Sequence, residues 1–475
     1  MPHLGTEAKC QQPVELSSEG RRQGTYILGI NGTGKSTLLL NVALEDIRAG
    51  DGLCLLDPHG DLIEEVITRV PPERADDVIL FDPADIDHPF GLNLFECPDR
   101  DDPRFVDRVC SEIVLTFKKL FPDFWGPRME DLIRHSVLTL VATPDCTLLD
   151  MLPLLTDDEA RKRYVSRTND PIIRHYWEQA FPENRRTQGE WVSSSLNKIG
   201  RFLTNPVIRN IVSQPRSSFD FRTIMDEGKV LLVNLSKGQL GEDNSALLGS
   251  VLVGKILIAA LSRAEVPQEQ RRPFHLIVDE YHSFATESFP TLQSEGRKFA
   301  IDTIVAHQYR DQLDQLNRGS TLNVGNFVLF RLTGRDARDM AMQFDNTPPE
   351  PEDVLRSIPY RTSHEGVFRT AGDKALMKGS SRSYGDVANE TANYLANVPN
   401  YRAYCKLIEG TELAEYYVQT QRCDAPKDQA VAGQIKERSR GLARPRREVE
   451  AFVAERFATV LGRDGHRPET AVYEA

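Results

Sequence analysis

The chain has 475 residues, of which 40% are hydrophobic and 27% charged, and its formal net charge is −12. This balance is typical of a globular protein of two or three domains, and it argues against a protein coated with nucleic acid, although a local basic channel stays compatible with it. The seven cysteines are dispersed without a C-x-x-C pair, which predicts reduced thiols in a cytoplasmic protein.

Residues 1–23 are polar and lack the apolar stretch of a signal peptide, so we expect a disordered leader. A short apolar run at 25–28 and a helical pattern at 37–48 then flank the stretch GINGTGKS at 29–36. This stretch matches the phosphate-loop pattern G-x-x-x-x-G-K-[ST] at every fixed position, in the strand–loop–helix context that the motif requires. The sequence therefore predicts a nucleoside triphosphate site.

The residues of this loop have distinct expected roles. Its glycines let the backbone turn so that N–H groups point at phosphate oxygens, and the start of the next helix faces the same anion. We expect Lys35 to reach the β- and γ-phosphates and the Ser36 hydroxyl to hold Mg²⁺. The residues expected to contact the nucleotide are Gly29, Gly32, Thr33, Gly34, Lys35, Ser36 and Thr37.

Apolar runs at 53–56 and 78–81 alternate with a helical pattern at 62–70, which predicts βαβ units and a parallel sheet. Asp57 and Asp82 follow the two apolar runs and would lie at the carboxyl edge of the sheet, where ligands bind. A helix or turn cap explains either carboxylate equally well.

Strand signals fade between residues 96 and 226. Helical periodicity covers 104–120, 129–142, 157–165, 171–180 and 190–203 instead, and the three tryptophans, Trp125, Trp177 and Trp191, lie in the same region. We expect a mostly helical insertion, with the tryptophans forming its small core rather than a platform for nucleic-acid bases.

The parallel sheet is expected to resume at about residue 227, with a strand at 229–234. The longest apolar run, 246–261, follows it. This run is shorter than the ~20 residues of a membrane span and carries Lys255, so we expect a buried core helix.

A second nucleotide motif follows this helix. The apolar run at 274–278 is followed by Asp279 and Glu280. Alone this pattern is a weak signal, but together with a phosphate loop it indicates the second half of a nucleotide hydrolysis site. We expect Asp279 to hold Mg²⁺ and Glu280 to orient and deprotonate the attacking water. The strand at 302–307 ends at Gln308, which is either a sensor of the γ-phosphate or a turn residue.

The remaining segments carry weaker signals. Residues 326–331 read as a strand, 345–385 as a loop rich in Pro, Gly and Ser, and 401–407 as an edge strand. From 421 the chain is charged and linker-like, and its basic cluster at 436–447 either binds nucleic acid or acidic lipid or is simply solvated. Residues 447–461 predict an amphipathic helix with an apolar face formed by Val449, Phe452, Val453, Phe457 and Leu461.

Five segments, taken together, resemble the HerA–FtsK class of hexameric DNA-pumping ATPases. They are GINGTGKSTLLLN, LLDPHGDL, FHLIVDEYHSF, EGRKFAIDTIVAHQY and NVGNFVLFRLTGRDA. Within this class the chain is similar to the cytosolic part of type IV secretion coupling proteins of the TraG/TraD type, over about residues 24–420. The resemblance implies an α/β fold: a RecA-like P-loop ATPase core with a mostly parallel sheet at 24–95 and 227–420, and an inserted all-α domain at 96–226.

The resemblance also implies roles for individual residues. Lys35 and Ser36 match the first nucleotide motif, and Asp279 and Glu280 match the second.

Two further positions are implied by the same resemblance. Gln308 corresponds to the polar sensor, and Arg297 corresponds to an arginine that reaches the nucleotide of a neighbouring subunit, which would make hydrolysis depend on ring assembly. Arg331 and Arg335 are rival candidates for that arginine.

The function implied is hydrolysis of ATP with Mg²⁺ by a homo-hexamer that moves DNA in conjugation or type IV secretion, with relaxosome or secretion-channel proteins as partners. Two alternatives stay open: a motor for protein export or pilus assembly, and a platform that recruits a relaxase or effector with little turnover. Coupling proteins usually carry N-terminal transmembrane helices, which are not evident in this sequence. Either the N-terminus is truncated and a membrane anchor is missing, or we expect a cytoplasmic variant that reaches the inner face of the cell membrane through its partners.

Overall fold

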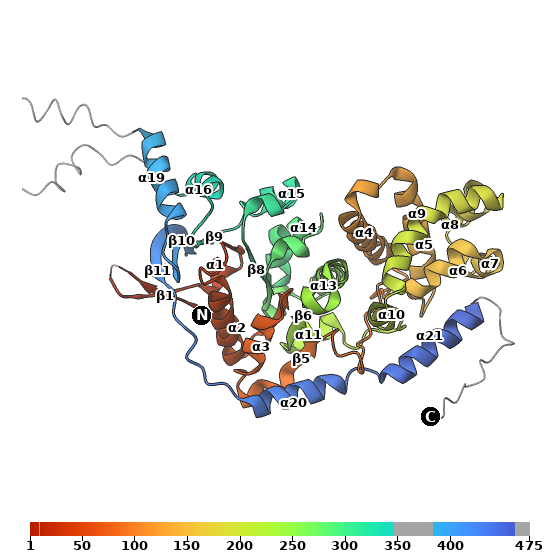
Figure 1. Cartoon of the computed structure of the whole chain (residues 1–475), viewed down its shortest axis with the longest axis horizontal. Coiled ribbons are helices and arrows are strands. Elements are labelled where there is room, and N and C mark those ends of the chain that lie inside the picture. The colour runs from red at the N-terminus through yellow and green to blue at the C-terminus, as the bar shows by residue number, and fades with distance from the viewer. Residues whose placement is uncertain (9, 345–382, 461–475) are drawn as a thin grey trace, which may run out of the picture.

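The computed structural model describes residues 1–8, 10–344 and 383–460, and these residues form an eleven-stranded sheet in the order β2-β1-β11-β10-β9-β3-β8-β7-β4-β6-β5 (Figure 1). The strands are β1 (His3–Glu7), β2 (Pro13–Glu15), β3 (Thr25–Leu28), β4 (Gly52–Asp57), β5 (Val78–Phe81), β6 (Val230–Asn234), β7 (Phe274–Val278), β8 (Ile301–His307), β9 (Asn326–Leu329), β10 (Arg402–Glu409) and β11 (Glu412–Gln419). All strands from β9 to β5 in this order run parallel, and the other four extend the sheet antiparallel. The predicted α/β class with a mostly parallel sheet is confirmed.

The central strands are buried along their whole length and are mostly apolar, because both faces of the sheet are covered. Within β4, Leu53 and Leu55 belong to one hydrophobic cluster, and Cys54 and Leu56 belong to the other. The first cluster lies under α2 (Lys35–Ala49), α3 (Asp61–Ile67) and α20 (Gln429–Arg440). The second lies under α11 (Phe221–Glu227), α13 (Glu242–Ser262) and α14 (Phe289–Glu295).

In the described part of the chain, five further helices belong to the core, and α19 is the longest of them. They are α1 (Ser18–Arg21), α12 (Lys237–Leu240), α15 (Gln315–Ser320), α16 (Gly334–Ala341) and α19 (Tyr384–Ala396). Among the described residues, one 24-residue stretch, Glu242–Glu265, is long and apolar enough to cross a membrane, but 78% of its most apolar window is buried inside the protein. It contains α13, which lies between the sheet and the helical region described next.

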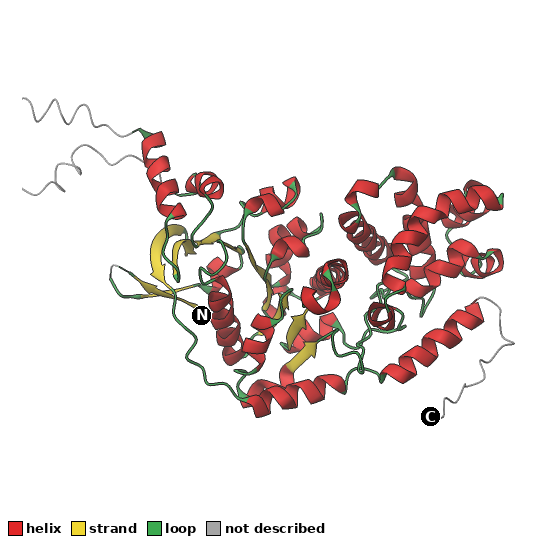
Figure 2. Ribbon diagram, viewed as in Figure 1, coloured by secondary structure: helices red, strands yellow, loops and turns green. Residues whose placement is uncertain are grey.

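Residues 96–226, all of them described, contain helices and no strand (Figure 2). The helices are α4 (Pro103–Leu120), α5 (Pro127–Val141), α6 (Met151–Thr156), α7 (Asp158–Val165), α8 (Pro171–His175), α9 (Arg185–Leu203) and α10 (Pro206–Val212). Trp177 is buried among them and donates a hydrogen bond from Nε1 to Thr139 Oγ1 at 2.8 Å. This helical insertion packs on the core mainly through α4, which lies against α13.

The expectation of a disordered leader at 1–23 is wrong, because β1, β2 and α1 order this segment. Leu4, Val14 and Leu16 are buried, and β1 pairs with β11 so that Thr6 lies opposite Gln419. Three apolar residues in a polar stretch are a weak strand signal. They suffice here because the pairing partner, more than 400 residues away, supplies the hydrogen bonds and the rest of the core.

The expectation of a linker after residue 421 is also wrong. Helix α20 buries Val431 and Ile435, and Ser439 Oγ accepts a hydrogen bond from the N–H of Leu80 on the edge strand β5 at 2.9 Å. The chain then continues into α21 (Arg446–Val460), which packs on the helical insertion (Figure 1). We call residues 429–460 the C-terminal strap, since they contact both the core and the insertion.

Charged contacts fasten the strap at both ends. Arg456 of α21 pairs with the buried Asp150 of the insertion at 3.1 Å. In α20, basic residues of the cluster at 436–447 pair with acidic residues of the core: Lys436 with Glu64, Arg438 with Asp76, and Arg440 with Asp85. The amphipathic face of α21 buries Val449 and Val453, whereas Phe457 is exposed and Leu461 lies outside the described residues.

The sequence predicts a strand at 401–407 and a loop at 345–385 in the second half of the chain. The strand expected at the sheet edge, β10, lies inside the sheet between β9 and β11, because β11 and then β1 add to it. Most of the loop expected at 345–385 lies outside the described residues.

A network of buried charges closes the amino edge of the parallel strands. Arg21 contacts both oxygens of Asp46, at 2.5 and 2.6 Å, and Asp302 at 3.0 Å. His275 places Nδ1 2.7 Å from Asp302 and Nε2 3.7 Å from Asp51. Burial alone would lower the pKa of His275, but the facing carboxylates outweigh it and raise the pKa from 6.5 to about 9.

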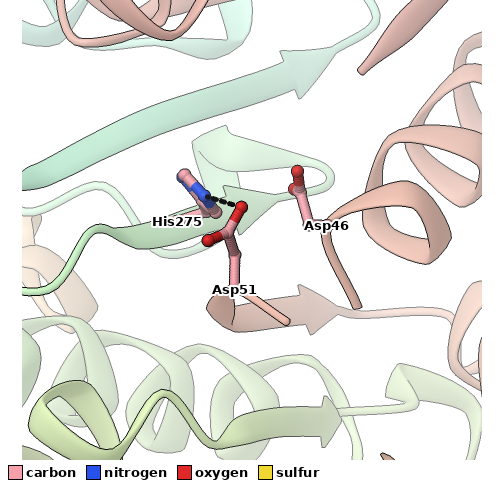
Figure 3. A group of neighbouring side chains, drawn as sticks. All are labelled: Asp46, Asp51 and His275. Carbon is pink, nitrogen blue, oxygen red and sulfur yellow. Dashed lines mark ion pairs between the residues drawn. The ribbon is translucent and has the colours of Figure 1, made fainter. Parts of the chain in front are cut away.

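The atoms of Asp46, Asp51 and His275 lie within 4.8 Å of one another, as metal ligands would (Figure 3). However, Asp46 is already held by Arg21 through both oxygens, and His275 carries a proton at neutral pH. The group is therefore an ion-pair network that stabilises the fold rather than a metal site.

The raised pKa of His275 predicts a pH-dependent stability. A folded-state pKa above the unfolded value stabilises the fold fully below about pH 6.5, and this contribution is lost as the pH rises through about 9. It amounts to about 3 kcal/mol. We expect the free energy of unfolding, measured by urea titration, to fall between pH 6.5 and 9 in the wild type and to fall much less in His275→Gln. His175→Gln, at an exposed position, should follow the wild type, whereas identical slopes for all three proteins would contradict the assignment.

Candidate nucleotide-binding site

The phosphate loop leaves the carboxyl end of β3 and turns directly into α2. Gly32 and Gly34 adopt left-handed φ angles of 74° and 118°, and Gly34 is the N-cap of the helix. A Cβ atom at Gly29 would lie 2.6 Å from Cβ of Phe330, so only glycine fits there. The loop is thus a backbone cradle at a helix N-terminus, which is the arrangement that binds phosphate.

Lys35 lies under this cradle and is only 6% exposed. Its Nζ donates to the carbonyl oxygen of Gly29 at 2.6 Å. Burial lowers the pKa of Lys35, and the nearby carboxylates of Glu280 and Asp279 oppose that shift. Thr33 closes the loop through a bond from Oγ1 to the carbonyl oxygen of Ile30 at 2.7 Å.

Asp279 and Glu280 follow β7 and are 4% and 5% exposed. The N–H of Asp279 donates to the carbonyl oxygen of Leu56 on β4, which fixes the pair at the carboxyl edge. Burial, together with the carboxylates of Asp57 and Glu280, raises the pKa of Asp279 to about 7. Such crowding of carboxylates favours a cation, and with the Ser36 hydroxyl the donors are all oxygen, as Mg²⁺ prefers. The residues present therefore fit Mg²⁺.

Glu280 is positioned by Gln308, which follows β8. Gln308 Nε2 donates to Glu280 Oε1 at 2.7 Å. The second oxygen, Oε2, is buried without a hydrogen bond among the described residues, and His282 Nδ1 lies 3.4 Å away without hydrogen-bond geometry. Burial lowers the pKa of His282 to about 4, so this imidazole is neutral at pH 7. One oxygen of Glu280 is thus fixed while the other stays available as a base.

The two carboxylates at the other strand ends have different roles. Asp57 accepts hydrogen bonds from the N–H groups of His59 and Leu62, both at 2.8 Å, so it caps the start of α3 and only adds negative charge near Asp279. Asp82 follows β5, the edge strand of the sheet. Four strands lie between β5 and β3, the strand that carries the phosphate loop, so Asp82 is not part of the site.

The structure does not bring Arg297 to the phosphate loop of its own chain. Arg297 is exposed in a short helix, Gly296–Phe299, that precedes β8, whereas the loop follows the parallel strand β3. Because β8 has 7 residues, the two edges are roughly 20 Å apart. Arg331 is next to the loop but donates to Asn400 Oδ1 at 2.8 Å, and Arg335 pairs with Asp311 at 2.6 Å.

Helix α4 contacts the segment that follows Glu280, and no pattern in the sequence predicts this contact. Lys119 Nζ donates to the carbonyl oxygen of His282 at 3.0 Å. Glu112 Oε2 accepts from Ser288 Oγ at 2.6 Å, and the neighbouring pair Lys118–Glu287 is 2.9 Å apart. The helical insertion is thereby connected to the candidate base.

Tyr401 is another residue near the loop whose position the sequence does not predict. It precedes β10, its N–H donates to the carbonyl oxygen of Thr33 at 2.7 Å, and its ring lies against Gly34. In the sequence, only the preceding Pro399 and Asn400 mark a turn, and nothing connects that turn with a loop more than 360 residues earlier.

Known proteins resemble this chain in sequence and in fold, although no family model matches it. The Type 4 coupling protein DotL of Legionella pneumophila is 20% identical over 378 residues, which cover 68% of this chain and 48% of DotL. The chain therefore spans about half the length of that relative.

Solved structures of a bacterial coupling protein share the fold. The unbound conjugative coupling protein TrwBdeltaN70 matches with a TM-score of 0.51 and 15% identity, over 89% of this chain and 91% of that one. The plasmid coupling protein TrwB with the GTP analogue GDPNP matches with a TM-score of 0.53 and 16% identity, over 87% and 89%. TrwB with ADP and Mg²⁺ gives 0.52 and 16%, over 86% and 88%. The resemblance to type IV secretion coupling proteins is confirmed.

The two left-handed glycines of the loop make a matched pair for a stability test. A Cβ at Gly32 meets open space, whereas one at Gly34 would lie 3.1 Å from Tyr401 and 3.2 Å from Phe330. We expect Gly32→Ala to lower the free energy of unfolding by about 1 kcal/mol and Gly34→Ala by roughly 2 to 3 kcal/mol, as measured by urea titration. Equal losses would show that the loop relaxes away from both aromatic rings.

Proposed function

We propose that this chain is the ATPase of a hexameric motor that moves DNA in conjugation or a related type IV secretion process. The observation that carries the proposal is the placement of Lys35, Glu280 and Gln308 at one edge of the sheet, with one oxygen of Glu280 fixed and one free. The coupling proteins DotL and TrwB support the choice of process, and the TrwB complexes with nucleotides support the choice of ligand.

In this proposal the residues divide the work of hydrolysis. The loop N–H groups and Lys35 bind the phosphates, and Glu280 orients the attacking water and accepts its proton. Gln308 keeps Glu280 in position through the bond to Oε1. Ser36 and Asp279 would hold Mg²⁺, which when bound offsets the negative charge of the phosphates.

Arg297 belongs to the proposal as a residue that acts on a neighbouring subunit. It is exposed and lies at the amino edge of the sheet, so it meets a nucleotide only if the carboxyl edge of another copy faces it. A ring of identical subunits creates that contact at every interface. Hydrolysis would then require assembly.

Relaxosome or secretion-channel proteins are the partners expected for such a motor, at the cytoplasmic face of the membrane. The cargo is the part of the proposal that rests on relatives alone, because the net charge of −12 offers no general attraction for DNA. A motor for protein export or pilus assembly would keep the same catalytic residues. A recruiting platform with little turnover would have no use for the arrangement of Glu280 and Gln308.

Steady-state ATP hydrolysis, with and without single- and double-stranded DNA over a range of protein concentrations, tests this function. We expect DNA to stimulate turnover and the specific activity to rise steeply with concentration, since the sites are completed between subunits. Lys35→Ala should lose nucleotide binding, and Glu280→Gln should bind ATP but turn it over at least about 100-fold more slowly. Turnover that ignores DNA would favour a protein cargo, and normal activity of Lys35→Ala would refute the mechanism.

The role of Arg297 can be tested by mixing variants before assembly. Arg297→Ala and Lys35→Ala should each lower turnover about 1000-fold or more. Rings formed from an equal mixture should recover about a quarter of the wild-type rate, because one interface in four then joins an intact loop to an intact arginine. Arg335→Ala, which removes an exposed ion pair with Asp311, is the matched control and should change little. A mixture no more active than its components would place Arg297 outside the site.

A further inference from the structure

Tyr401 has a backbone conformation that tyrosine rarely adopts. Its φ angle is 61°, in the left-handed region. Hydrogen bonds hold it there from both sides: its N–H donates to the carbonyl oxygen of Thr33 at 2.7 Å, and its own carbonyl oxygen accepts from both N–H and Oγ1 of Thr420 at 2.9 Å. Strained residues that are fixed so firmly concentrate at ligand sites.

The side chain of Tyr401 is only partly engaged in packing. It is 39% exposed, and its hydroxyl makes no hydrogen bond to any described residue. One part of the ring packs on the backbone of Gly34, since a Cβ there would lie 3.1 Å from Cδ1. The ring therefore adds a partly exposed aromatic surface beside the phosphate loop.

The sheet order fixes the direction in which a nucleotide would leave this loop. Glu280 and Gln308 follow β7 and β8, on one side of β3, so the γ-phosphate lies toward that side. A nucleotide bound in this orientation would extend away from β7 and β8, toward β9 and the start of β10, on the opposite side of β3. Tyr401 is at that position, because β10 runs antiparallel to β9 and begins at the carboxyl edge.

We propose that Tyr401 stacks on the base of the nucleotide held by the phosphate loop. This inference rests on the proposed function, since it takes the loop as a nucleoside triphosphate site. Stacking on an aromatic ring needs only the π-face of a base, so the contact selects nucleotides over bare polyphosphate without choosing among bases. The strained backbone matters because it directs the ring along the loop rather than into the core.

Binding of ADP and of pyrophosphate to the full chain in the presence of Mg²⁺, measured by calorimetry, separates the base from the phosphates without any turnover. Tyr401→Asn removes the ring and keeps a residue that tolerates the left-handed conformation. We expect it to weaken ADP binding roughly 10- to 100-fold and to leave pyrophosphate binding within about twofold. Tyr401→Phe should bind both like the wild type, and so should Tyr394→Ala, which removes another exposed tyrosine.

A reporter variant gives a second, independent measurement. In Tyr401→Trp, ADP should quench the added tryptophan fluorescence and pyrophosphate should not. Equal weakening of ADP and pyrophosphate by Tyr401→Asn would show that the ring only supports the loop, and unchanged binding of both would show that it makes no contact. Either result overturns the inference while leaving the nucleotide site intact. A wild-type protein that binds neither probe, with Lys35→Ala no different, would overturn the proposed function together with the inference.

Discussion

The chemistry proposed for this protein depends on the common direction of β3, β7 and β8. Because the three strands are parallel neighbours in the sheet, the residues that follow them meet at one edge, although they are up to 280 positions apart in the chain. The hydrogen bond from Gln308 to Glu280 is the direct result, since it joins the ends of adjacent strands. Reversing any of these strands would place its terminal residues at the far edge, where Arg297 lies.

Buried carboxylates lie at both edges of the parallel sheet, but their roles differ. At the amino edge, Asp46 and Asp302 each have a cationic partner, so burial of charge is compensated within the chain. At the carboxyl edge, Asp279 faces other carboxylates, and Lys35 is the cation whose charge is felt there. A compensated cluster stabilises the fold, whereas an uncompensated one has capacity left for a ligand.

Features that depend on residues close together in the sequence could be predicted, whereas features that depend on contacts between distant residues could not. The phosphate loop and Asp279–Glu280 could be read because each is a local pattern at a strand end, and Gln308 could be placed because it ends the next strand. Residues 1–23 and α20 could not, because a few apolar side chains among charges become a strand or helix only when a distant partner buries them. The positions of Lys119 and Tyr401 depend entirely on contacts across the fold.

The pairing of β1 with β11 also has a consequence for how the chain reaches its folded state. During synthesis β1 and β2 emerge long before β11, the strand that completes their ladder, because β11 lies more than 400 residues further along the chain. The C-terminal strap follows later still. Contacts between such remote segments make folding slow, and the waiting edge is a place where another chain can pair wrongly. All the parallel strands, β3 to β9, precede β11 in the chain, so the pairing of β1 with β11 can form only after the parallel core has been synthesised.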